Sequence, residues 1–152
     1  MAVYQVLTVP DELLRQKAIP VPKINTGILR VLDNMIDTLY AFDGVGLAAP
    51  QIGVSKRIIV VDPGDNLIEM INPQIILREG DVTASEGCLS VPKVRGLVPR
   101  AERIIVRGLN RQGEEFEVEA TELLARAFQH EIDHLDGILF TDKAIQVKRK
   151  SE

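Results

Sequence analysis

Two stretches of the chain carry apolar residues at helical spacing. The first is 25–42, where apolar residues recur every three or four positions: Ile28, Val31, Leu32, Met35, Leu39 and Phe42. This spacing predicts a long amphipathic helix with Asn25 or Thr26 as its N-cap and Gly44 as its stop. The second stretch begins at Thr121 and reaches about residue 135. Gly137 follows it, as expected after a helix C-terminus.

Between these helices the pattern favours short strands. The predicted strands are 57–62, 67–72, 74–78, 103–109 and 115–120. The first contains a fully apolar run that ends at Asp62-Pro63-Gly64, as a buried strand followed by a turn would. Pro73 separates the second from the third. The last two flank a turn ending at Gly113, and glutamates alternate with Phe116 and Val118, which predicts a hairpin with one acidic face.

The order of these elements predicts the fold class. A helix, several antiparallel strands and a second helix favour an α+β fold over a repeated βαβ unit. We therefore expect antiparallel sheets packed around the C-terminal helix, with a long N-terminal helix beside them. The opening segment is punctuated by prolines, with at most a turn or two of helix at 11–16. No repeat or linker divides the chain, so we expect a single domain over residues 1–152.

Composition narrows the classes of function. The net charge is −4, so nothing suggests nucleic acid as a direct substrate. Cys88 is the only cysteine, which excludes an internal disulfide framework and favours a reducing compartment. No run approaches the roughly 18 apolar residues of a membrane span, and the N-terminus lacks the features of a signal peptide. We expect a cytoplasmic protein without a membrane partner, whose basic run Lys148-Arg149-Lys150 is a solvated tail.

The pentapeptide His-Glu-Ile-Asp-His in the second helix is the main candidate for chemistry. It contains both histidines of the chain, His130 and His134, which are four positions apart. Residues at this spacing project from one helix face and can bind one metal ion. Leu123 and Ala127 continue the same stripe, so the imidazoles should point into the protein. Glu131 lies beside this face, within reach of a metal-bound water. The alternative is a chance occurrence of the motif on a surface helix.

A catalytic metal site usually needs a third protein ligand. One protease pattern requires a histidine at position 140, but that residue is Phe140, and the only glutamate after the motif is Glu152. Cys88 is the best upstream donor, because it lies in a segment of small residues, 86–90, interpreted as a loop between strands. A zincin-type endopeptidase would need a different third ligand. A structural metal domain would need a fourth, and no second cysteine or third histidine exists.

A glycine-containing segment at 44–51, Gly-Val-Gly-Leu-Ala-Ala-Pro-Gln, is the third element. Its glycines are consistent with a loop that brings the backbone close to a ligand. They are equally consistent with a helix stop followed by a tight strand entry. No phosphate-binding signature follows, so a P-loop is not expected.

Taken together, segments 44–51 and 86–90 and the motif Gln129-His-Glu-Ile-Asp-His134 resemble the three signature motifs of peptide deformylases, in order and in spacing. The similarity extends from about Gln5 to about Phe140. The resemblance implies that Cys88, His130 and His134 hold the metal and that Glu131 is the general base and acid. It also implies that Gln51 and the N–H of Leu89 stabilise the oxyanion, and that the backbone of Val45, Gly46 and Gly87 binds the peptide. Leu123 and Ala127 would form a pocket for the methionine side chain, and Glu86 and Arg95 would support the site.

The implied reaction is hydrolysis of the N-terminal formyl group from formyl-methionine of newly made polypeptides, with release of formate. The implied cofactor is one divalent metal ion, natively Fe(II), with zinc, nickel or cobalt as alternatives. The partners would be N-formylmethionyl peptides and nascent chains. Relatives often carry a longer C-terminal extension that contacts the ribosome, so a ribosome contact through the basic tail is left open.

Overall fold

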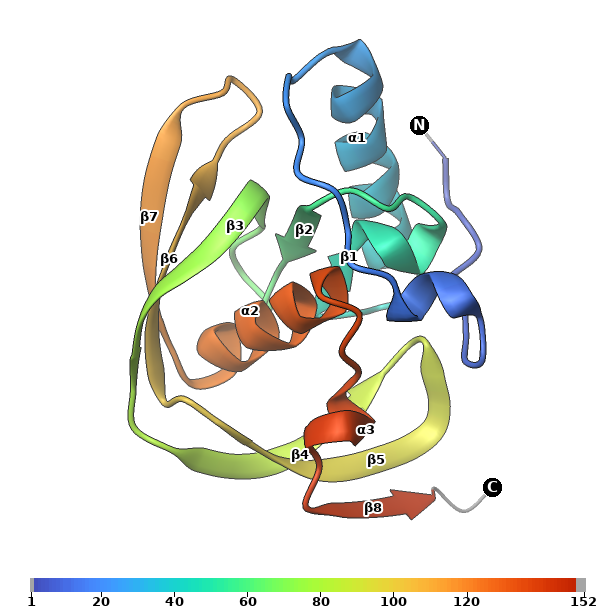
Figure 1. Cartoon of the computed structure of the whole chain (residues 1–152), viewed down its shortest axis with the longest axis vertical. Helices are drawn as coiled ribbons and strands as arrows, with labels where there is room; N and C mark the ends of the chain where they lie inside the picture. The colour runs from blue at the N-terminus through green and yellow to red at the C-terminus, as the bar shows by residue number, and fades with distance from the viewer. Residues whose placement is uncertain (1, 150–152) are drawn as a thin grey trace.

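The strands form two antiparallel sheets on either side of α2 (Glu122–Leu135) in the computed structural model, which describes residues 2–149 (Figure 1). The larger sheet has the order β1 (Gly46–Ala48), β2 (Ile58–Val61), β3 (Ile68–Glu79), β6 (Arg103–Leu109), β7 (Glu115–Thr121). The smaller sheet has the order β4 (Val82–Cys88), β5 (Val91–Arg100), β8 (Gln146–Arg149). The predicted α+β class with antiparallel sheets around the C-terminal helix is therefore confirmed.

Burial on both faces explains why β2 has no polar position. Its residues alternate between two cores, as side chains along a strand must. Ile59 and Val61 pack in the cluster that contains Phe128 and Leu135 of α2. Ile58 and Val60 pack in the cluster formed by α1 (Thr26–Ala41). The larger sheet is thus covered by one helix on each face, and α2 is fixed against it.

The first helix begins as its sequence predicts. The Asn25 side chain accepts a hydrogen bond from Ile28 N–H at 3.0 Å and caps α1. The apolar stripe of the helix is buried through Ile28, Leu32, Met35 and Leu39. The single-turn helix η1 (Glu12–Arg15) also lies in the range expected for it.

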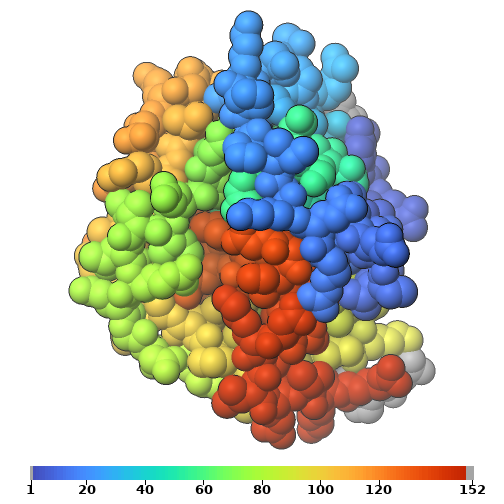
Figure 2. Space-filling model, in the orientation of Figure 1, coloured from blue at the N-terminus to red at the C-terminus, as the bar shows by residue number. Residues whose placement is uncertain are grey.

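The C-terminal end of α2 is fixed by the N-terminal segment. Ala18 N–H donates to the carbonyl of Leu135 at 2.7 Å, and Arg15 forms an ion pair with Asp142 of α3 (Phe140–Lys143). Figure 2 shows this segment in blue, lying against the red C-terminal part of the chain. Gly137 follows the helix with φ of 73°, and a Cβ there would lie 2.4 Å from the carbonyl oxygen of Arg15. Only glycine fits this position.

The predicted break at Pro73 is wrong, because β3 runs continuously from Ile68 to Glu79. Pro73 lies within a register shift between Ile71 and Gln74 in the pairing of β3 with β6. A bulge of this kind requires no ladder N–H at the proline. The adjacent Asn72 side chain instead bonds both backbone groups of Val21, at 2.8 and 2.9 Å.

The structure changes the assignments of segments 86–88 and 148–149, and for segment 44–51 it shows the strand entry that the sequence left open. Glu86, Gly87 and Cys88 belong to strand β4 and not to a loop. Segment 44–51 enters the edge strand β1 and continues into the short helix η2 (Ala49–Ile52). Lys148 and Arg149 are solvent-exposed, as expected, but they form strand β8 instead of a tail, while Lys150 lies outside the described residues. No helix within residues 2–149 is long and apolar enough to cross a membrane.

Candidate metal centre and cleft

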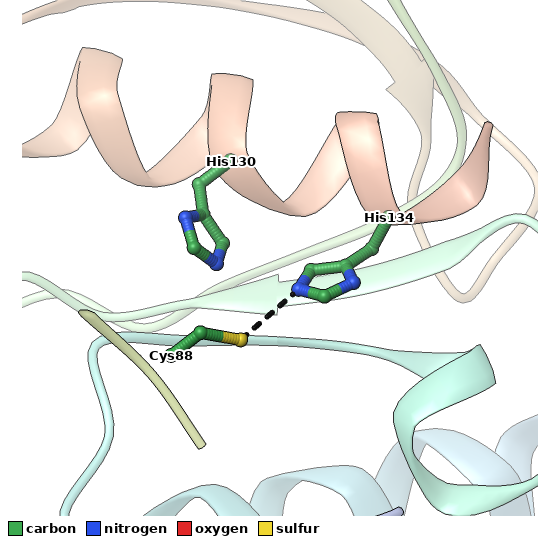
Figure 3. A group of neighbouring side chains, drawn as sticks. All are labelled: Cys88, His130 and His134. Atoms are coloured by element: carbon green, nitrogen blue, oxygen red, sulfur yellow. Dashed lines mark hydrogen bonds between the residues drawn. The ribbon is translucent and has the colours of Figure 1, made fainter. Parts of the chain in front are cut away.

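Three side chains that could hold a metal ion converge between α2 and β4. One donor atom each from Cys88, His130 and His134 lies within 4.8 Å of the other two. Both imidazoles project from α2 towards the cysteine, and Cys88 Sγ is 3.3 Å from His134 Nε2 (Figure 3). The ligand atoms of a tetrahedral site with metal bonds of about 2.0–2.3 Å lie roughly 3.3–3.7 Å apart. The structure therefore brings together the three residues proposed from the sequence.

Glu86 sets the orientation of the His130 ring. Its Oε1 lies 2.9 Å from His130 Nδ1, which leaves Nε2 directed at the other two donors. A carboxylate on the far nitrogen of a histidine is the usual support for a metal ligand, because it fixes the tautomer and raises the basicity of the ring. Glu86 is a positioning residue, buried at the end of β4.

Glu86 is itself held by two arginines. Arg100 donates to both of its carboxylate oxygens at 2.9 Å, and Arg126 donates to Oε2 at 2.5 Å. Arg100 also reaches Asp133 on the same helix as the histidines, at 2.6 Å. Burial by itself would raise the pKa of Glu86, but the bonds from Arg100 and His130 hold this pKa well below its usual range. The carboxylate is thus ionised where it contacts His130.

The electrostatics of the two histidines differ although they share one face. Burial lowers the pKa of His134 well below its usual value, so this ring is neutral. Burial also opposes the protonation of His130, but the Glu131 carboxylate and hydrogen bonds with Cys88 and Glu86 raise its pKa to about 10. The anionic groups around His130 thus favour a positive charge at this point. A divalent cation bound here would satisfy that preference and take the place of the proton.

Glu131 lies against the site in an unusually tight space. Its Oε2 is 4.0 Å from His130 Nε2, and burial raises the pKa of its carboxyl to about 7. A Cβ at Gly46 would lie 2.7 Å from this same oxygen, so only glycine in β1 admits the carboxylate. Within residues 2–149, the buried side-chain atoms without a hydrogen-bond partner are Glu131 Oε1 and His134 Nδ1. Glu131 Oε1 is thus a buried acceptor whose hydrogen-bonding capacity is unused.

Gln51 connects β1 to the turn after β4. Its Oε1 accepts from Ala48 N–H at 2.9 Å, and its Nε2 lies 3.0 Å from Ser90 Oγ and 3.7 Å from Cys88 Sγ. Gln51 is almost fully buried, so its amide is fixed in orientation beside the three donors. Leu89 lies in the turn between Cys88 and Val91, outside the β4–β5 ladder. Both residues line the cleft that opens onto the site.

A cleft of about 450 Å³ leads to the metal centre. The cleft is lined by all of the residues for which the resemblance implies substrate binding or support of the site: Val45, Gly46, Glu86, Gly87, Arg95, Leu123 and Ala127. Leu123 differs from expectation, because 48% of it is exposed at the cleft and it does not continue the buried stripe. Arg95 donates hydrogen bonds to Ser85, to its hydroxyl at 2.9 Å and to its carbonyl oxygen at 3.2 Å.

The sequence reasoning missed the residues that support Glu86. Arg100 and Arg126 are isolated basic residues without a motif, and only the tertiary contacts single them out. Asp133 had a signal, because it lies inside the pentapeptide between Glu131 and His134. It is three positions after His130, so it lies beside the inward face of the helix, where a buried carboxylate indicates a buried cationic partner.

The polypeptide deformylase family profile matches residues 3–150. The chain belongs to the polypeptide deformylase family. It is 62% identical to a peptide deformylase from Syntrophomonas wolfei, over 97% of each sequence, and 59% identical to one from Carboxydothermus hydrogenoformans, over 99% of each. The crystal structure of a peptide deformylase from Legionella pneumophila superimposes with a TM-score of 0.90 at 44% identity, covering 93% of this chain and 85% of the other.

Membership of this deformylase family establishes the class of activity. The chain is an enzyme, a hydrolase that removes the N-terminal formyl group from nascent peptides. The likeness to solved deformylases also confirms the α+β class with antiparallel sheets. The geometry described above shows a candidate metal site in the same molecule.

Proposed function

We propose that deformylation by this chain depends on one divalent metal ion held by Cys88, His130 and His134. The observation that carries this proposal is the convergence of the three donor atoms, with His130 Nδ1 already bonded to Glu86. A thiolate and two imidazoles fit a borderline cation, and an open fourth position is what a catalytic site requires.

We propose Fe(II) as the native ion, with zinc, nickel and cobalt as functional or inhibitory substitutes. The donor set accepts all four, so availability in the cell decides which is bound. A cysteine thiolate next to a ferrous ion would make activity sensitive to oxidation. Cys88 lines the cleft and is only partly buried, which is consistent with oxidation by a small molecule that enters the cleft.

We infer that the substrate binds as an extended strand between two sheet edges. β1 and β4 are edge strands of their sheets, and Gly46 and Gly87 lie on opposite sides of the cleft. The Val45 carbonyl already accepts a hydrogen bond from Asp62, so the alternate residue Gly46 presents its backbone to the cleft. Val45 then contributes its side chain at the rim. Peptide addition to a sheet edge is a common recognition mode.

The methionine side chain would enter the part of the cleft beside α2. Leu123 and Ala127 are one helical turn apart and provide apolar surface there. Arg95 spans the β4 edge close to Gly87, where a Cβ would lie 2.9 Å from its Nη1. We assign Arg95 to the wall that aligns the peptide backbone.

The bound cation would polarise the formyl carbonyl and lower the pKa of water towards neutrality. Glu131 would take a proton from the attacking water as the carbon–oxygen bond forms. It would deliver that proton to the leaving amine as the carbon–nitrogen bond breaks. The pKa of about 7 for Glu131 suits both directions of transfer. Gln51 Nε2 and the Leu89 N–H would stabilise the developing oxyanion, and each such donor contributes on the order of 3 kcal/mol.

We further propose that a single domain carries this activity in the cytoplasm, on chains emerging from the ribosome. A direct ribosome contact through Lys148, Arg149 and Lys150 remains a prediction, and Lys150 lies outside the described residues.

The test is formate release from a formyl-Met peptide by anaerobically prepared protein, with metal content measured on the same sample. We expect formate from the wild type and neither formate nor stoichiometric metal from Cys88→Ala. Formate release without bound metal would overturn metal dependence, and one tightly bound ion in Cys88→Ala would overturn the ligand assignment. Cleavage of an internal bond in an unformylated peptide would favour an endopeptidase.

A further inference from the structure

A second hollow lies on the outer face of the smaller sheet, next to the cleft. It has a volume of about 480 Å³. Its walls include residues from all three strands, β4, β5 and β8: Ser85, Arg95, Leu97, Gln146, Lys148 and Arg149. Ser85 and Arg95 line both this groove and the cleft. The two hollows are therefore adjacent, with Ser85 and Arg95 in the wall that they share.

The strand register explains how the groove is formed. Ser85 pairs with Leu97, and Leu97 pairs with Gln146, so these three side chains form one row across the sheet. Arg95 and Lys148 are paired in the adjacent row on the same face. The opposite face carries Val98 and Glu86, which are buried towards the metal centre. One sheet thus separates the site on its inner face from the groove on its outer face.

The groove is cationic with an apolar floor. Arg95, Lys148 and Arg149 line it, and none of its described lining residues is acidic. Lys148 and Arg149 are exposed, and Leu97 is 36% exposed between them and Ser85. This positive patch contrasts with the net charge of −4 for the whole chain. Positive charge in a concave surface attracts anionic groups.

We propose that this groove is a subsite for the substrate chain itself, downstream of the formylated residue, and that it favours acidic side chains there. The inference rests on the proposed function, because it requires the formylated end to lie in the cleft. An extended chain advances about 3.3 Å per residue, so a few residues carry it from the cleft past Arg95. The path would run over the β4 edge of the sheet, where Ser85 and Arg95 line both hollows.

An RNA occupant is less well supported by these observations. Binding to a nucleic acid backbone relies on neutralising many phosphates, whereas this groove offers three cations on a chain of negative net charge. Because the groove shares a wall with the cleft, the best-supported occupant is the peptide that the proposed function places in the cleft. A nascent chain with a glutamate or an aspartate among its first residues has the charge that complements the groove and would reach it from the cleft.

The test compares kcat/KM for formyl-Met peptides of equal length in which one glutamate moves outward from the second residue. A matched series carries lysine at the same positions. At low salt we expect the glutamate series to exceed the lysine series by roughly threefold to tenfold at the positions that reach the groove, since exposed charge pairs contribute modestly. The preference should decline at high salt.

The variant Lys148→Glu/Arg149→Glu should reverse this preference, and Lys148→Gln/Arg149→Gln should abolish it. A formyl-Met dipeptide, too short to reach the groove, should be hydrolysed by both variants at the wild-type rate. Lys23→Glu/Arg30→Glu is the matched control, because it changes two exposed cations in the same way at the start of α1. This control should keep the wild-type preference.

The outcomes separate the two proposals. If wild-type protein releases no formate from the dipeptide, the proposed function fails. If the dipeptide is hydrolysed but the glutamate and lysine series are equal, or the preference survives in Lys148→Glu/Arg149→Glu, the subsite is refuted. Loss of binding to a single-stranded RNA oligonucleotide in that variant, with an unchanged peptide preference, would assign the groove to RNA and also refute the subsite.

Discussion

Two arginines three residues apart form similar ion pairs in very different surroundings. Arg100, at the end of β5, contacts Glu86 and Asp133, while Arg103, at the start of β6, contacts Glu79 and Glu119. Each guanidinium thus holds two carboxylates. However, 3% of the Arg100 side chain is exposed, compared with 35% for Arg103. The same chemistry is buried at the metal centre in one case and lies at the surface in the other.

The difference shows that burial and onward contacts decide what an ion pair does. When one partner of a buried ion pair is removed, the other charge stays buried without a partner and without water. When one partner of an exposed pair is removed, water hydrates the charge that remains. Only the Arg100 group continues to a candidate metal ligand, through Glu86 and His130 Nδ1. The Arg103 group connects β3, β6 and β7 at the outer surface and reaches no site residue.

The largest effect should come from removing the buried guanidinium. Arg100→Met is expected to lower the free energy of unfolding by about 3–5 kcal/mol, because Glu86 and Asp133 lose a buried partner. Urea unfolding at neutral pH measures this change in the free energy of unfolding. If the variant does not fold, Arg100→Lys, which keeps the charge but loses the bidentate bond, should show a smaller loss. Wild-type stability in both variants would show that this network does not hold α2 against β5.

Neutralising Glu86 should affect the metal more than the fold. Glu86→Gln is expected to weaken metal affinity about 10–100-fold, since it removes the charged support of His130. Competition with a chromophoric chelator gives the affinity, and Glu119→Gln on the exposed network is the control. Equal metal affinity in the two variants would remove Glu86 from the support of the site.

The pH dependence of the Glu86 contribution should be smaller but has a definite sign. Its carboxyl has a pKa well below its ordinary value of 4.5, because Arg100 and His130 outweigh the effect of burial. A group with a lowered folded pKa stabilises the protein above its unfolded pKa and loses that contribution as pH falls. The stability difference between wild type and Glu86→Gln should therefore be full at pH 7 and shrink below about pH 4.5. A difference that grows on acidification would contradict this assignment.

The smallest effect is expected for the exposed network. Arg103→Met should leave metal affinity unchanged and shift the thermal midpoint only slightly, because water hydrates the exposed carboxylates of Glu79 and Glu119 once the guanidinium is removed. Differential scanning calorimetry measures the thermal midpoint, and the same chelator competition measures the metal affinity. A loss comparable to that of Arg100→Met would erase the contrast between the two networks.

The sequence was sufficient to predict that the three candidate ligands lie together, because their signals are local or come from elimination of other donors. His130 and His134 share a helix face by their spacing, and Cys88 was the remaining upstream donor. The two helices and the hairpin were predicted because their periodicity extends over many residues. These features depend on neighbours along the chain.

The supporting network could not be predicted because it depends on contacts between distant residues. Arg100 and Arg103 look alike in the sequence, and only the packing of α2 against β4 and β5 buries one of them. Pro73 predicts a strand end in the sequence, but a register shift accommodates it within β3. The strand β8 also escaped prediction, since its alternation of polar and apolar residues is short and both faces are exposed.

The most direct test of the metal-centre account is Glu131→Gln, with bound metal and single-turnover formate release measured on the same preparation. Glu131 is not among the three donors, so the variant should retain one metal ion per chain. It should release formate on the order of 10²–10⁴-fold more slowly than the wild type, because the proton carrier is lost. A variant that keeps its metal and turns over near the wild-type rate would contradict the account.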